Sequence, residues 1–204
     1  MKAKIKKPLL AAVAAVLVCL FGVRVYAVNH AYPNAEVVMV PFGETVQAGY
    51  YEYTVKNAVW LPSYEEMLDY CSEDTESRAA LAEDVPKRPY ETKWCIVEIE
   101  ITNIDEKEHS FPPALSIEKR LGNDAWGNGS DPYLERFLYG ERDFPRVIQP
   151  KETETAFFGY SFSYVPKQKL YEEWAGASLS DFYIPVQLYP AKICLALAGD
   201  SGGQ

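Results

Sequence analysis

An alternating stretch at residues 93–103, KWCIVEIEITN, constrains the fold of this chain more than any other feature. Successive side chains of a strand point to opposite faces. One face of this stretch is apolar along its whole length, at Cys95, Val97, Ile99 and Ile101. The other face is polar at Glu98 and Glu100 but apolar at Trp94 and Ile96. The pattern predicts a strand with one buried face, whose opposite face is covered only near its beginning.

Helical spacing replaces the alternation just before this strand. Ser63 and Glu66 have the spacing of a helix capping box. Apolar side chains then recur at helical intervals, at Tyr64, Met67, Leu68 and Cys71. A second short helix is expected at residues 75–82. We expect this helical insertion, residues 61–92, to cover the apolar end of the outer face.

Strand patterns recur on both sides of the insertion. Strands are expected at residues 36–40, 45–60, 93–103, 110–121, 153–165, 182–188 and 192–198. Between them, a loop is expected at residues 122–130, a helix beginning at Pro132, and a short helix at residues 167–175. The regular helical crossovers of a parallel sheet are missing from this order. The sequence predicts a mainly β fold, an immunoglobulin-like antiparallel β-sandwich over residues 36–198 with helical insertions at 61–92 and 122–146.

The amino terminus carries four lysines and then a run of 16 apolar residues that begins at Pro8. This pattern is typical of a signal anchor or a secretory signal peptide. Arg24 fits a hydrophobic helix that stops at the membrane interface, whereas small residues before position 28 fit cleavage after Ala27. We expect an anchor in the cell membrane with the domain outside, or secretion after cleavage near Ala27. The remaining segments are the anchor or signal at 1–27, a linker at 28–35 and a disordered tail at 199–204.

Charge excludes one class of partner. The chain has 20 basic and 29 acidic residues, for a net charge of −9, and five of the basic residues lie in residues 1–27. The part after residue 27 therefore carries a charge of about −14. Such a domain is repelled by phosphate backbones and by anionic lipid, so we expect no nucleic-acid binding and membrane contact through the amino-terminal helix only.

Four segments mark strand and turn geometry: YYEYTVKNAVWL, KWCIVEIEITNID, VIQPKETETAFFGYSF and AKICLAL. They resemble the immunoglobulin-like extracytoplasmic domains of bacterial lipoproteins and membrane-tethered proteins, a family of unknown function. The resemblance spans residues 44–198 and is interrupted by the insertions at 61–92 and 122–146. Lys151 stands where that family usually has glycine. The resemblance implies a β-sandwich at the cell surface, with no established activity.

Catalytic, cofactor and metal sites are not expected. The histidines are His30 in the linker and His109 in a charged turn, and neither accompanies a nucleophile motif. Glu98 and Glu100 lie on one strand face, where a solubilising role explains them.

A calcium loop is a weaker possibility that the sequence leaves open. Asp124, Asn128, Gly129 and Glu135 match the oxygen and glycine positions of an EF-hand loop. Trp126 occupies a position that requires an oxygen ligand, so an ordinary loop before a capped helix explains the same residues.

Three cysteines follow the amino-terminal segment: Cys71, Cys95 and Cys194. An odd number allows at most one internal disulfide, and three thiols are the alternative. Cys95 is expected in the core and Cys194 on the outer face. Cys71–Cys194 is the favoured pairing.

Aromatic residues near turns and insertions are the remaining candidates for a binding surface. The four candidate binding residues are Trp94, Trp126, Tyr133 and Trp174; Tyr50 and Tyr64 share their setting. The alternative is that these side chains pack the helices onto the sandwich. We expect a non-enzymatic binding module whose partner is an envelope protein or a small ligand. A carboxylate-based hydrolase and a structural envelope spacer are the alternatives.

Overall fold

The computed structural model describes residues 7–31, 35–72, 74–112, 115–119, 126–139, 147–164 and 175–199. The chain divides into two compact units, Met1–Glu36 and Val37–Gln204. The first unit contains helix α1, Lys7–Ala31. Its segment Ala11–Val28 is long and apolar enough to cross a membrane, and none of it is buried against the rest of the protein.

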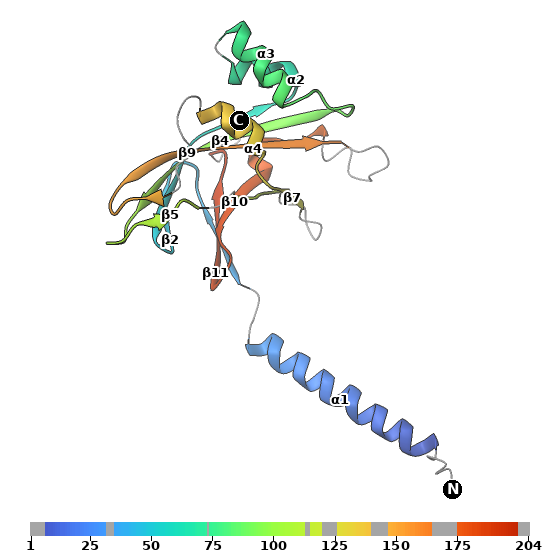
Figure 1. Ribbon diagram of the computed structural model, residues 1–204. Coiled ribbons are helices and arrows are strands. Elements are labelled where there is room, and N and C mark those ends of the chain that lie inside the picture. Colours follow the sequence, from blue (N-terminus) through green and yellow to red (C-terminus); the bar gives the residue numbers. More distant parts are fainter. Residues whose placement is uncertain are drawn as a thin grey trace. The chain divides into compact units, whose positions relative to one another are not determined.

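The second unit is an antiparallel β-sandwich, as predicted (Figure 1). A four-stranded sheet has the order β2 (Thr45–Ala48), β3 (Tyr51–Leu61), β4 (Thr92–Asn103) and β9 (Thr153–Ser163). A five-stranded sheet has the order β1 (Glu36–Val40), β11 (Ala191–Ala196), β10 (Phe182–Gln187), β6 (Ile117–Lys119) and β7 (Trp126–Asn128). A small third sheet pairs β5 (His109–Ser110) with β8 (Val147–Ile148).

Strand β4 lies at the centre of the four-stranded sheet, paired antiparallel with β3 and β9 along its whole length. Its inner face is buried as the alternation predicted: Cys95, Val97, Ile99 and Ile101 are all 0% exposed. These side chains meet Ile184 of β10 and Leu195 of β11 in the core between the two larger sheets. The hydrophobic effect on this continuous apolar layer holds the sandwich closed.

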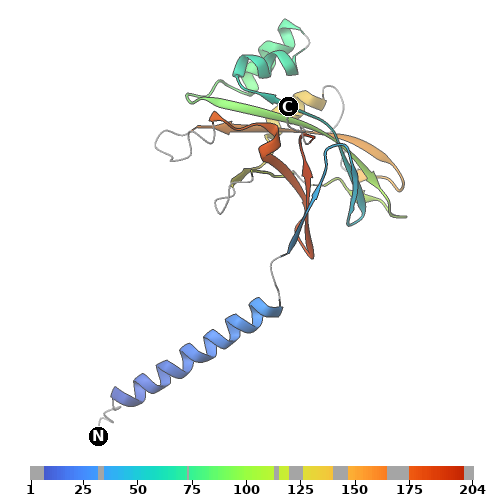
Figure 2. The same cartoon turned by 180° about the vertical axis from the view of Figure 1, so that it is seen from behind.

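The outer face of β4 is covered at its first end by helices α2 (Tyr64–Cys71) and α3 (Thr75–Asp84), seen above the sheet from both sides (Figures 1 and 2). Trp94 and Ile96 are 2% and 3% exposed within a second apolar cluster. This cluster also contains Leu61, Met67, Leu68, Leu81, Val85 and Leu134. The predicted covering role of the insertion is confirmed. Leu134 of α4 (Pro132–Tyr139) adds a contribution that the sequence did not indicate.

Strand β9 is the edge of its sheet, and residues 128–139 protect its hydrogen-bonding groups. The Asn128 amide donates to the Ser161 carbonyl at 2.5 Å, and the Asp131 N–H donates to the Gly159 carbonyl at 2.7 Å. The Phe157 N–H donates to the Tyr139 hydroxyl at 3.0 Å. An edge whose groups are paired in this way offers no template for another chain.

Two expectations for the middle of the chain differ from the structure. The loop expected at residues 122–130 contains strand β7, which pairs with β6 because the chain returns along the five-stranded sheet. The strand expected at residues 110–121 is regular only at β5 and β6 in the part described. The short helix expected at residues 167–175 falls, except for residue 175, outside the described residues, as does most of the tail.

The turn before β9 uses a left-handed residue. Lys151 has φ 63°, in the region that glycine adopts without steric cost. The Lys151 N–H donates to the Asn103 carbonyl at 2.9 Å, and its ammonium group donates to the Ile104 carbonyl at 2.5 Å. These contacts hold the turn against the end of β4, at the position where the resembled family has glycine.

Candidate functional site

A pocket of about 460 Å³ lies where the helical insertion returns to the four-stranded sheet. Its walls come from the start of α2, the loop that precedes β4, the first residues of β4 and the segment at Ala175. The lining residues are Pro62, Ser63, Tyr64, Glu65, Lys87, Arg88, Tyr90, Glu91, Thr92, Lys93, Trp94 and Ala175. Its volume lies in the range of small-molecule sites.

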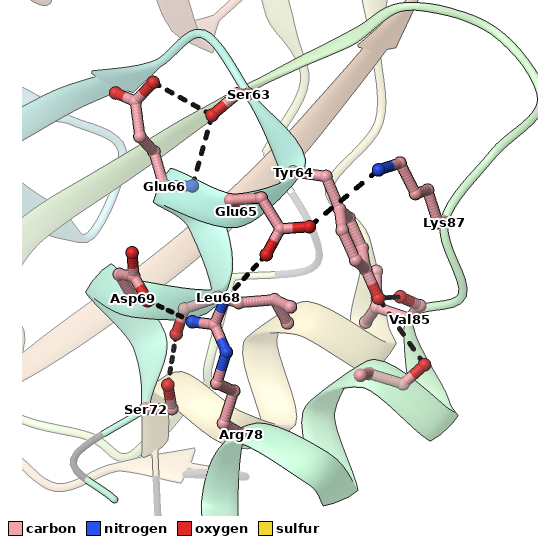
Figure 3. A network of polar contacts seen from close by, with 11 residues as sticks. Ser63, Tyr64, Glu65, Glu66, Leu68, Asp69, Ser72, Arg78, Val85 and Lys87 are labelled. Atoms are coloured by element: carbon pink, nitrogen blue, oxygen red, sulfur yellow. Dashed lines mark hydrogen bonds and ion pairs between the residues drawn. The ribbon is translucent and has the colours of Figure 1, made fainter. Parts of the chain in front are cut away.

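The α2 wall is fixed by its cap and by Tyr64 (Figure 3). The Ser63 hydroxyl accepts the Glu66 N–H at 3.2 Å, which satisfies one of the open donors of the first turn. The Tyr64 hydroxyl donates to the Val85 carbonyl at 2.8 Å and so ties α2 to the end of α3. This pair of contacts sets the position of the Tyr64 ring at the pocket.

The opposite wall is tied to the edge strand β9. The Tyr164 N–H donates to the Glu91 carbonyl at 2.9 Å. The Thr92 and Ser163 hydroxyls lie 2.8 Å apart, and Thr92 also donates to the Tyr90 carbonyl at 3.1 Å. The loop that carries Lys87, Arg88 and Tyr90 is therefore attached at its end to a rigid sheet.

The four candidate binding aromatics do not form one surface. Trp94 lines the pocket, but it is buried and packs the helices onto the sheet, so its interpretation as an exposed binding residue is wrong. Tyr133 is 63% exposed on α4 and is not among the lining residues. Trp126 lies in β7, and Trp174 lies outside the described residues. Tyr64, which shares their setting, does line the pocket.

Sequence reasoning missed the exposed cations and the exposed tyrosine of the pocket. Tyr90 is 45% exposed, and the side chain of Lys87 is 70% exposed. Arg88 stands beside Lys87 in the stretch VPKRPYE. The available signal was a pair of adjacent cations between two prolines, followed directly by a tyrosine, in an acidic domain.

The favoured disulfide does not form. Cys71 ends α2 on the outer side of the four-stranded sheet, whereas Cys194 lies in β11 of the opposite sheet, and the structure has no bond between them. Leu195, the next residue, packs into the core between the sheets, so Cys194 lies on the outer face as expected, but it is 0% exposed there. The half-buried pair of Glu118 and Lys192, with the Tyr183 ring, lies near it on that face. Burial raises the pKa of the Cys71 thiol to about 12.

The carboxylates of the alternative hydrolase are spread along a sheet face. Glu100 forms an ion pair with Lys56 at 3.1 Å, and neither Glu98 nor Glu100 lines the pocket. Within the described ranges, no group of three or more His, Cys, Asp or Glu side chains has the arrangement of a metal site. Asp124 of the possible calcium loop falls outside those ranges.

Glu135, the last residue of that loop pattern, is a buried carboxyl on α4. Burial raises its pKa to about 7; the Ser130 hydroxyl opposes the shift and the Asp131 carboxylate adds to it. Its Oε1 atom has no hydrogen-bond partner. Burial therefore makes ionisation of this side chain costly, and a carboxyl group that resists ionisation is a poor ligand for calcium.

His109 is the first residue of β5, at the end of the charged turn in which the sequence analysis placed it. Its Nε2 atom is 2.7 Å from Asp105 Oδ2, and its ring stacks on Tyr50 with centroids 4.0 Å apart. The hydrogen bond from His109 is the main cause that lowers the pKa of Asp105. These contacts order the turn between β4 and β5.

Comparison with known proteins gives three weak structural likenesses. No family model matches the chain, and no curated protein matches it. A conserved hypothetical protein from Bacillus anthracis is 15% identical, with a TM-score of 0.45 over 71% of this chain and 87% of that one. An uncharacterized β-sandwich protein from Clostridium difficile 630 is 16% identical, with a TM-score of 0.45 over 80% and 96%. The yjhA protein from Bacillus subtilis is 12% identical, with a TM-score of 0.42 over 77% and 99%. None of these likenesses bears on what this chain binds.

Proposed function

We propose that this chain is an extracytoplasmic binding module without catalytic activity, held at the cell membrane by α1. The main support for this proposal is the pocket of about 460 Å³. The helical insertion contributes to its walls, so the strands of the sandwich alone do not form it. Its mixed lining of aromatic rings, hydroxyls and charges suits recognition of a small ligand or of a protruding group on a partner protein.

The amino-terminal helix supports the location. Its span Ala11–Val28 has a mean hydropathy of 2.3, and lysines precede it on the side that positive charge keeps in the cytoplasm. Retention of the helix places the pocket outside the membrane on a tether. Cleavage after Ala27 would instead release the same module. The mass of the mature protein, which shows whether residues 1–27 are retained, distinguishes the anchored form from the released form.

The test is capture of the partner in intact cells. The full chain with a carboxy-terminal tag is cross-linked, purified and read by mass spectrometry, as wild type, Tyr90→Ala and Tyr133→Ala. Tyr133 is the matched control, since it is an exposed tyrosine that does not line the pocket. We expect one dominant adduct that Tyr90→Ala removes and Tyr133→Ala retains. Equal capture by all three forms, or no adduct in any, contradicts recognition of a partner protein through the pocket.

A further inference from the structure

The pocket concentrates positive charge on a domain that is otherwise strongly acidic. Lys87, Arg88 and Lys93 line it against the carboxylates of Glu65 and Glu91. The remainder of the domain is acidic and repels anions at long range. The cations of the pocket can therefore attract an anionic group only at short distance. Which of these charges is already compensated decides what the pocket attracts.

Glu65 is compensated by a cation outside the pocket lining (Figure 3). Its Oε2 atom accepts from Arg78 Nη2 at 2.7 Å, and Arg78 also bonds Asp69. The contact between Glu65 Oε1 and Lys87 Nζ is 3.8 Å, longer than a hydrogen bond. Arg78 therefore holds the carboxylate. The Lys87 ammonium keeps only this long contact and a position over the Tyr64 ring, 5.8 Å from its centroid, and its side chain is mostly exposed.

Arg88 is also held loosely. Its guanidinium lies 3.5 Å from Asp131 Oδ2 and 3.5 Å from the Ser163 hydroxyl. Charge-assisted hydrogen bonds of guanidinium groups are shorter, about 2.7–2.9 Å. Lys93 differs, because its ammonium group donates to the Ala175 carbonyl at 2.6 Å and lies over the Trp60 ring. The cations presented to a ligand are thus Lys87 and Arg88, adjacent on one loop.

Tyr90 and two hydroxyl groups of the lining define the rest of the ligand. Tyr90, on the same loop, exposes a ring on which the apolar face of a sugar can stack. The Trp94 indole N–H is a buried donor without a hydrogen-bond partner. This nitrogen is enclosed by the protein, so it makes no contact with a ligand in the pocket. The Ser63 and Thr92 side chains add hydroxyls to the same lining.

We propose that the pocket binds a sugar that carries a phosphate or a carboxylate. Lys87 and Arg88 meet the anionic group, and Tyr90 packs against the ring. The inference rests on the proposed function and adds the chemical class of the ligand to it.

The test uses the full chain in neutral detergent micelles, with binding followed by tryptophan fluorescence and by calorimetry. The probes are glucose 6-phosphate, glucuronic acid, glucose and inorganic phosphate. We expect at least one of the two anionic sugars to bind more tightly than both glucose and phosphate, and the binding to weaken as salt rises from about 0.02 M to about 0.5 M. Which of them binds identifies the anionic group as phosphate or carboxylate.

Variants locate the site. We expect Arg88→Ala to weaken binding of the preferred probe about tenfold, because a charged hydrogen-bond partner is lost, and Arg88→Lys to restore part of it. Lys56→Ala is the matched control, since Lys56 is an exposed lysine paired with Glu100 away from the pocket. Circular dichroism confirms that each variant is folded.

Three results overturn the proposal: glucose binds as tightly as the anionic sugars, Arg88→Ala and Lys56→Ala behave alike, or no probe binds. If no sugar binds while Tyr90→Ala still removes the cross-linked partner in cells, the ligand class is wrong and the binding module stands. If an anionic sugar binds at Arg88 while cell capture does not depend on Tyr90, the sugar is confirmed and the partner protein is not held by the pocket.

Discussion

Replacing Glu135 by glutamine should remove a pH dependence of stability that this one buried carboxyl creates. Its pKa lies at about 7 in the folded chain instead of 4.5, so ionising it costs the folded state about 3 kcal/mol more than the unfolded state. Below pH 4.5 both states hold the proton and the contribution to stability is full. Between pH 4.5 and 7 only the unfolded chain releases the proton, so the free energy of unfolding falls as pH rises. Above pH 7 the loss is complete.

Urea denaturation of the full chain in micelles, followed by tryptophan fluorescence at pH 4, 6, 7 and 8.5, measures this effect. The difference between Glu135→Gln and wild type at pH 4 is the internal reference, since the carboxyl is neutral there in both states. We expect the variant to gain about 3 kcal/mol relative to wild type between pH 4 and 8.5. A difference that stays constant across this range refutes the account of Glu135 as a desolvated, unpaired acid.

Three further substitutions test the packing and the turns of the sandwich, each by the urea midpoint at constant slope. Asn103→Ala should lower the free energy of unfolding by about 2–3 kcal/mol. The buried Asn103 amide donates to the Lys107 carbonyl at 2.7 Å and to the Ile148 carbonyl at 2.9 Å, and both bonds are lost. A loss below about 0.5 kcal/mol contradicts that role. Lys151→Gly should raise the free energy of unfolding by up to about 1 kcal/mol, because glycine adopts the left-handed backbone without steric cost. A clear loss of stability would mean that the contacts of the lysine side chain contribute more than the backbone strain costs. Gly159→Ala should lower the free energy of unfolding by about 1–3 kcal/mol, because the new methyl group lies 2.6 Å from Leu134 Cδ2. An unchanged urea midpoint would contradict this and would show that α4 moves away without cost.

The fold followed from the sequence where burial repeats with a fixed period. The alternation in β4 predicted which of its faces is buried and which points outward. A one-residue shift would have placed charged side chains in the core. The two apolar residues on its outer face predicted the covering helices, and Ser63 located the start of α2. Sequence reasoning failed where the partner comes from farther along the chain, as with Leu134 against β9. It also missed β7, because Gly127 and Asn128 read as loop residues although they pair with the preceding strand β6.

The site was less predictable than the fold for the same reason. Trp94 attracted notice by its chemistry, but a large aromatic side chain stabilises most when it is buried, and the helices bury it. The groups that face solvent are Lys87, Arg88 and Tyr90, which look like ordinary loop residues until the fold places them beside α2. Cys194 lies on the outer face of its sheet as expected, but neighbouring side chains such as Tyr183 bury it there, which the alternation alone does not reveal.

Photo-cross-linking from the pocket itself tests the central claim most directly. A photoreactive amino acid replaces Tyr90 in one form of the full chain and Tyr133 in another, and both are expressed and irradiated in intact cells. The account predicts an adduct from position 90 that Lys87→Glu/Arg88→Glu abolishes, with none from position 133. Adducts of equal yield from both positions, or an adduct at position 90 that survives the charge reversal, would contradict it.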